Sequence, residues 1–206
     1  MKTTSSYPNV RYMCMRPKST GTHEHPPLIR QQQSKIPSDD LKNCISNLQE
    51  ELSRGNDASY SYGNIKRYNQ SRKSHRQDAK LFKQGVRNAK ISDRPLYTTG
   101  LDPCVAVMIA KNGVSLCMHI DEYSEMAKSK LIRYLGKASC NDVSIGIVGA
   151  NQPGSQAKAL KIIKDIADNG FLDSIKMVSV HNGHNSVLCI PEEQKTGEDI
   201  FYVGKE

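Results

Sequence analysis

Two apolar runs flank the dipeptide Asn112-Gly113: VAVMIAK at 105–111 and VSLCMHI at 114–120. Asn-Gly favours the type I′ turn that joins two antiparallel strands, because both central positions of that turn need positive φ. A two-residue loop pairs Lys111 with Val114, and the register then places Ala106 opposite His119. The stretch therefore predicts a β-hairpin whose pairing is fixed by its turn.

The side chains of this hairpin divide between two faces. Strand alternation gives one wholly apolar face, expected to be the core side, made of Val105, Val107, Ile109, Leu116, Met118 and Ile120. Cys104 and His119 fall on the other face as diagonal neighbours, with Cβ atoms roughly 6–8 Å apart. An imidazole there can take the thiol proton to give a thiolate–imidazolium pair, with the Cys104 backbone N–H as an oxyanion donor. The position of both side chains on one face of the hairpin also fits a buried cysteine and a buried histidine without a catalytic role.

Helical and strand patterns alternate along the rest of the chain. Apolar spacing predicts helices at 38–55, 75–90, 122–139 and 152–170, a buried strand at 143–150 and a final strand at 198–204. A second hairpin is predicted at 175–191, turning at Asn182-Gly183, with His181 and His184 solvated beside the turn. The fold class is α+β: antiparallel or mixed sheets in a sandwich-like arrangement, flanked by helices.

The basic charge of the chain is confined to its N-terminal half. Residues 1–95 hold 18 Lys and Arg against 8 Asp and Glu, whereas residues 96–206 hold 11 against 13. The first segment has few long apolar runs, so it cannot bury enough surface to offset the entropy of ordering. We therefore predict a basic, mostly disordered region at 1–90 with one or two amphipathic helices, a linker at 56–74, and a folded domain at 91–206.

Several functional classes find no support in the sequence. The basic region contains no aromatic-interleaved motif and no zinc spacing, so no nucleic-acid partner is expected. The six cysteines form no CxxC pair, which argues against a metal site and against a disulfide framework. No run reaches the roughly 18 apolar residues of a membrane span, and the N-terminus lacks the apolar core of a cleaved signal peptide.

The bend before the hairpin carries a family resemblance. Thr98-x-Gly100-Leu101-x-x-Cys104, followed by His119 in the partner strand, resembles the site of the CheD-type chemoreceptor glutamine deamidases. It is similar also to the deamidase toxins related to them, the cytotoxic necrotizing factors and Burkholderia lethal factor. The resemblance covers about residues 95–195 and does not include the first 90.

The resemblance implies a protein-glutamine deamidase, a cysteine hydrolase that converts one glutamine of a target protein to glutamate. Cys104 is then the nucleophile, His119 the general base and acid, and Thr98 the hydroxyl that holds the imidazole; no metal or organic cofactor is needed. The basic N-terminal region favours a secreted bacterial effector, a virulence factor exported without a cleaved signal, with an export chaperone at that region. Its substrate in the host cytoplasm would be a GTPase or a translation factor.

Three alternatives fit the same residues: a chemoreceptor deamidase of the bacterial cytoplasm, a non-catalytic binding protein on the same scaffold, and transglutamination through the same thioester. Asp102-Pro103 replaces the small residues that precede the family's cysteine, and a carboxylate beside a thiol opposes thiolate formation. Asp121, predicted opposite Cys104, either orients His119 or is a polar residue at the strand end, and we favour the second interpretation.

Overall fold

A computed structural model describes residues 39–55, 60–67, 80–81, 89–136, 138–150, 152–181, 183–191 and 200–205. These residues belong to one compact unit, which begins at Lys35. The predictions for residues 1–38 lie outside the described residues.

A six-stranded mixed sheet forms the centre of the described structure. Its strand order is β1-β9-β8-β6-β7-β4. The strands are β1 (Tyr60–Gly63), β4 (Ala89–Ser92), β6 (Val105–Lys111), β7 (Val114–Ile120), β8 (Val143–Gly149) and β9 (Ile175–Val180). All neighbouring pairs are antiparallel except β8 and β9, which run parallel and are joined through a helix.

A second, five-stranded sheet has the order β2-β11-β10-β5-β3. It contains β2 (Lys66–Arg67), β3 (Lys80–Leu81), β5 (Leu96–Thr99), β10 (Ser186–Cys189) and β11 (Phe201–Gly204). Its longer strands, β5, β10 and β11, pair antiparallel, and the two short strands at its edges pair parallel.

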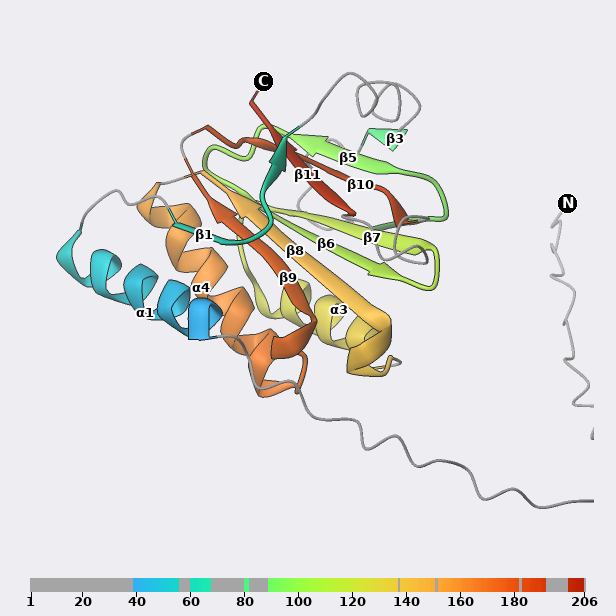
Figure 1. Cartoon of the computed structure of the whole chain (residues 1–206), viewed down its shortest axis with the longest axis horizontal. Helices are drawn as coiled ribbons and strands as arrows, with labels where there is room; N and C mark the ends of the chain where they lie inside the picture. Colours follow the sequence, from blue (N-terminus) through green and yellow to red (C-terminus); the bar gives the residue numbers. More distant parts are fainter. Residues whose placement is uncertain are drawn as a thin grey trace, which may run out of the picture. The chain divides into compact units, whose positions relative to one another are not determined.

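Three helices cover one face of the six-stranded sheet, and the five-stranded sheet covers the other (Figure 1). The helices are α1 (Asp39–Arg54), α3 (Glu125–Leu135) and α4 (Pro153–Asp168), with short 3₁₀ turns at Cys140–Asp142 and Leu172–Ser174. Ser124 caps α3 by accepting the backbone N–H of Ala127, and Pro153 suits the first turn of α4, where no intrahelical donor is needed.

The packing produces two apolar cores on either side of the central sheet. The predicted core face of the hairpin packs against the helices, as expected. The opposite face, which carries Cys104, is also fully buried, because it packs against Leu96, Val187 and Val203 of the second sheet. The α+β class with two stacked sheets and flanking helices is therefore confirmed.

The predicted hairpin register is confirmed pair by pair, with Ala106 opposite His119 and Lys111 opposite Val114. Asn112 and Gly113 both have positive φ, as the turn requires. The helices predicted at 38–55, 122–139 and 152–170 correspond to α1, α3 and α4, and the strands predicted at 143–150 and 198–204 correspond to β8 and β11.

Two local predictions are wrong. Residues 175–191 are not a hairpin: β9 lies in the six-stranded sheet and β10 in the five-stranded sheet, so the turn between them crosses the sandwich. The predicted helix at 75–90 is contradicted where it is described, since 80–81 and 89–90 are strand.

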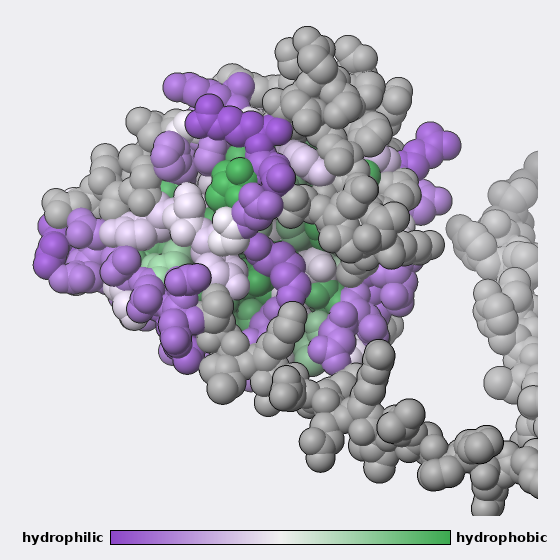
Figure 2. Space-filling view, in the orientation of Figure 1, coloured by the Kyte–Doolittle hydropathy of each residue, from purple (hydrophilic) through white to green (hydrophobic). Residues whose placement is uncertain are grey.

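The structured part of the chain also begins earlier than residue 91. Leu41, Cys44 and Leu48 of α1 are buried in the helix-side core, and β1 extends the sheet beyond β9. These apolar residues therefore dock α1 onto the chain's own domain, and the outward side of α1 is hydrophilic (Figure 2). Part of the predicted linker at 56–74 likewise forms strands in both sheets.

Candidate functional site

Cys104 lies at the end of a bend that is pinned to the second sheet. Gly100 has a φ of +74°, a conformation that favours glycine. The N–H of Leu101 then donates to the carbonyl of Asn185, at 3.1 Å, just before β10. Asp102 and Pro103 are exposed, and Cys104 is the first residue after them to be fully buried. The bend therefore carries the thiol from the surface into the space between the sheets.

Thr98 and His119 meet inside the sandwich, one from each sheet. Thr98 faces inward from β5, His119 faces inward from β7, and Thr98 Oγ1 lies 2.8 Å from His119 Nδ1. Both residues are buried, at 0% and 4% exposed. A hydroxyl on Nδ1 fixes the orientation of the ring, and the other nitrogen, Nε2, is buried without a hydrogen-bond partner among the described residues.

The structure thus brings the three predicted residues to one interior region, with one difference from the expected geometry. Cys104 comes directly before β6, two residues before Ala106, which is the partner of His119. Cys104 and Ala106 both face the second sheet. His119 Nε2 has no hydrogen-bond partner among the described residues, so it does not bond the Cys104 thiol in this state. The two residues are diagonal neighbours across the hairpin.

The electrostatics keep both groups neutral. Burial raises the pKa of the Cys104 thiol, the positive charge of Lys158 lowers it, and the carboxylates of Asp121 and Asp102 raise it further. Burial lowers the pKa of His119, against an upward contribution from Asp121. A preformed thiolate–imidazolium pair, expected from the sequence, is therefore disfavoured in this resting state. A neutral imidazole beside a neutral thiol is nevertheless the arrangement that general-base catalysis starts from.

The backbone N–H of Cys104 is not an available oxyanion donor, contrary to the prediction. It donates to the carbonyl of Leu101 at 3.0 Å and closes the turn of the bend. An N–H held in such a turn cannot also reach a developing oxyanion without opening the bend. A donor to an oxyanion must therefore come from another group.

The two carboxylates beside the thiol have structural contacts. Asp121 accepts the backbone N–H of Glu122 at 2.7 Å, which supports its interpretation as a polar residue at the strand end. Asp102 accepts a long hydrogen bond, 3.5 Å, from the side-chain amide of Asn185. Both carboxylates therefore act on the site mainly through their charge.

The start of α4 supports the bend from the other side. Ser155 donates to the carbonyls of Asp102 and Cys104, at 3.1 and 3.3 Å, and Lys158 donates to the carbonyl of Pro103. Neither residue stands out in the sequence. The only available signal was their place in the first two turns of a helix, which predicts no specific contact.

A second buried histidine repeats the Thr98–His119 arrangement. His184 Nδ1 lies 2.7 Å from Ser179 Oγ. His184 is 4% exposed, and its Nε2 is buried without a hydrogen-bond partner among the described residues. Burial, with the nearby charges of His181 and Arg67, lowers the pKa of His184 to about 4. The prediction that His184 is solvated is therefore wrong, because its turn crosses between the sheets.

Ser179 and His119 lie in one row across the six-stranded sheet. Ser179 pairs with Val148, Val148 with Ala106, and Ala106 with His119. Three strand spacings of about 4.8 Å separate the two ends of this row, so the two histidines are distinct groups within the same interior layer.

Among the described residues, no group of three His, Cys, Asp or Glu side chains is placed to hold a metal ion. In the same part of the chain, no helix is long and apolar enough to cross a bilayer. No protein-family model matches the chain, and no curated protein matches it in sequence.

Proposed function

We propose that this protein is a protein-glutamine deamidase in which Cys104 is the nucleophile, His119 the proton-transfer group and Thr98 the residue that orients it. The observation that carries the proposal is the buried Thr98–His119 hydrogen bond, which leaves Nε2 unpartnered beside the face that holds the thiol. A buried nitrogen without a partner is unfavourable for stability, and a catalytic role is one explanation for keeping such a group. The resemblance of the bend sequence to CheD-type deamidases supplies the reaction class.

The reaction begins with the neutral pair. Cys104 Sγ attacks the side-chain carbonyl carbon of glutamine while its proton passes to His119 Nε2, and the carbonyl electron pair moves to oxygen. The tetrahedral intermediate collapses as the carbon–nitrogen bond breaks. The leaving nitrogen takes the proton from the imidazolium and departs as ammonia, which leaves a thioester.

Water completes the cycle. His119 Nε2 accepts a proton from the water as its oxygen attacks the thioester carbonyl, and the sulfur leaves and recovers the proton from the imidazolium. The products are glutamate in the target protein and the free enzyme. An amine in place of water would give transglutamination by the same steps.

The biological setting we favour is a bacterial effector that acts on a host protein such as a GTPase or a translation factor. The basic composition of residues 1–38, six Lys and Arg against one Glu, supports it, since these residues precede α1 and a chemoreceptor deamidase of the bacterial cytoplasm has no evident need for them. An export chaperone that binds the N-terminal region belongs to the same proposal.

Mass spectrometry of co-expressed candidate proteins tests the proposal. The full-length chain should convert one specific glutamine to glutamate, and Cys104→Ser should abolish the conversion. Cys117→Ser is the matched control, because Cys117 is equally buried in the same core but lies outside the proposed site. Equal deamidation by the Cys104→Ser and Cys117→Ser proteins would exclude the proposed nucleophile.

A second candidate, a non-catalytic binding protein, is favoured by two observations. The Cys104 N–H is held in the turn of its bend, and burial with two nearby carboxylates opposes thiolate formation. If this is the function, Cys104→Ser should leave partner binding unchanged. An electrophilic glutamine analogue should then label Cys104 no faster than it labels Cys117.

A further inference from the structure

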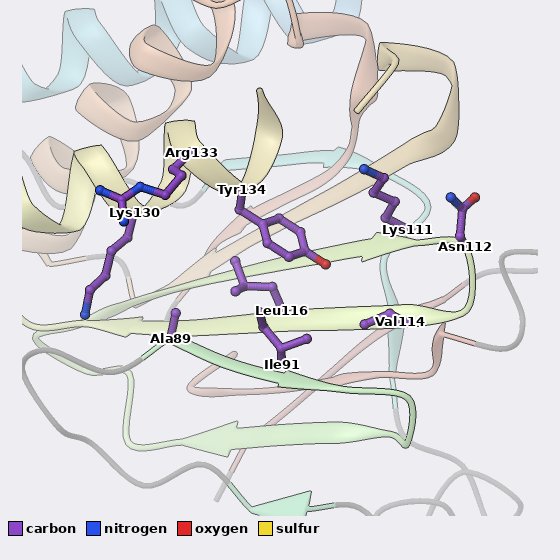
Figure 3. Close-up of a pocket in the computed structure, with 9 residues that line it drawn as sticks. All are labelled: Ala89, Ile91, Lys111, Asn112, Val114, Leu116, Lys130, Arg133 and Tyr134. Carbon is purple, nitrogen blue, oxygen red and sulfur yellow. The ribbon is translucent and has the colours of Figure 1, made fainter. Parts of the chain in front are cut away.

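An open groove lies between α3 and the edge of the six-stranded sheet, at the end where β6 turns into β7. Its cavity volume is about 520 Å³, within the range of specific binding sites. The floor is formed by Val114 and Leu116 of β7 and Ile91 of β4, and Tyr134 of α3 covers it from above (Figure 3).

The floor exposes apolar surface that the fold itself does not cover. Ile91 is 58% exposed, in contrast to the interior residues of the same sheet. Covering a large aliphatic side chain is favourable because it removes apolar area from water. An exposed isoleucine in a concave site is therefore a natural contact for a ligand's apolar side chain.

The charged residues that line the groove are all cationic. Lys111, Lys130 and Arg133 line it, and no acidic residue does. Figure 3 places Lys130 toward one end of the apolar floor and Lys111 toward the other, at the β6–β7 turn. The groove is therefore complementary to a ligand that carries negative charge on both sides of an apolar group.

The groove is separate from the proposed catalytic site. Cys104 precedes β6 and Lys111 ends it, so about seven residues at about 3.3 Å each, roughly 20 Å, lie between them. Leu116 faces the helix-side core, whereas Cys104 faces the second sheet. Substitutions in the groove can thus be made without touching the site.

We propose that this groove binds an extended segment of a protein partner that places acidic residues on both sides of an apolar residue, laid alongside β4. Within the described residues β4 is the last strand of its sheet and pairs only with β7, and the proposed segment would add as a strand at its other edge. The chain's own N-terminus is a poor occupant, because residues 1–38 hold six Lys and Arg against one Glu.

Selection from a displayed library of random peptides on the purified full-length protein tests the proposal. The enriched peptides should carry acidic residues on both sides of an apolar residue. A synthetic peptide of the enriched sequence should slow amide exchange in Ala89–Ser92, as strand addition requires. Ile91→Glu and Arg133→Glu should each weaken its binding about tenfold or more.

Matched controls exist on the same surface. Met126→Glu places the same charge on an exposed apolar residue of α3 that does not line the groove, and Lys161→Glu reverses an exposed charge of α4. Both variants should bind the peptide like the unmodified protein.

Four results would overturn the proposal. One is the absence of acidic–apolar enrichment, and a second is peptides that bind equally well to the Ile91→Glu protein. Another is groove-dependent binding of dodecanoate without peptide binding, which would identify a small amphipathic anion as the occupant. The last is self-association that Ile91→Glu abolishes in sedimentation experiments, which would identify a second copy of the chain.

Discussion

Replacing Thr98 with valine tests the centre of the proposed site. Valine keeps the shape and the β-branch of threonine, so the strand should persist. The substitution removes the hydroxyl that lies 2.8 Å from His119 Nδ1. It therefore leaves both ring nitrogens of a buried histidine without a side-chain partner, since Nε2 has none in the described structure.

The expected losses of stability and of rate follow from the removal of one hydrogen-bond partner of His119. Leaving one buried polar atom unsatisfied costs about 1–3 kcal/mol, and the unfolding free energy should fall by this amount. The proposed deamidation should slow by about tenfold to hundredfold, because Nε2 can serve as the base only while the proton is held on Nδ1. With the hydroxyl gone, nothing specifies that tautomer.

Two measurements on the full-length protein check this prediction without a known substrate. Urea denaturation gives the unfolding free energy, and ¹⁵N NMR of the imidazole reports which nitrogen of His119 carries the proton. Thr99→Val is the matched control, because strand alternation points Thr99 away from the interior face that holds Thr98. The reasoning fails if the two variants show the same stability and the same His119 spectrum, or if wild-type His119 already carries its proton on Nε2.

Three further outcomes are expected. In the resting protein, iodoacetamide should modify exposed Cys140 before buried Cys104, as measured by mass spectrometry of the modified peptides. The reverse order would show that Cys104 is a preformed thiolate. Because burial lowers the pKa of His184 from 6.5 to about 4, the folded state resists its protonation. The contribution of His184 to the unfolding free energy should therefore be complete above pH 6.5 and fall by about 3 kcal/mol as the pH drops toward 4. Urea denaturation should show a smaller fall in the His184→Gln protein. Gly63→Ala should destabilise the protein more than Gly55→Ala in thermal unfolding, since both glycines have positive φ but only at Gly63 would a Cβ overlap the backbone of Lys176; equal shifts would refute the role of that contact.

The sequence predicts the β6–β7 hairpin in full because its turn and its alternation are both local properties. Asn112-Gly113 selects the turn, the turn sets the register, and the register places Cys104 and His119 on one face. The same local logic locates α1, α3 and α4, whose apolar stripes are readable over a few turns.

Non-local pairing is what the sequence could not supply. Asn182-Gly183 carries the same sequence signal as the turn of the first hairpin, but the strands on either side of it pair with partners in different sheets. That choice buries His184, which local composition would leave in water. The hydrogen bond that holds the Cys104 N–H likewise depends on the path of the 101–104 bend, which no residue pattern specifies.

The pairing of the first strands with the last ones affects how the chain folds during synthesis. β1 pairs with β9, and β2 pairs with β11, which lies inside the second sheet between β2 and β10. These early strands must therefore wait for partners made more than 100 residues later, since Tyr60 pairs with Val180 and Lys66 with Tyr202. The described six-stranded sheet cannot be complete until Val180 has emerged from the ribosome, and the five-stranded sheet not until Gly204 has. Contacts between residues so distant in the chain also predict slow folding, because the entropy of closing large loops is lost before the strands can pair.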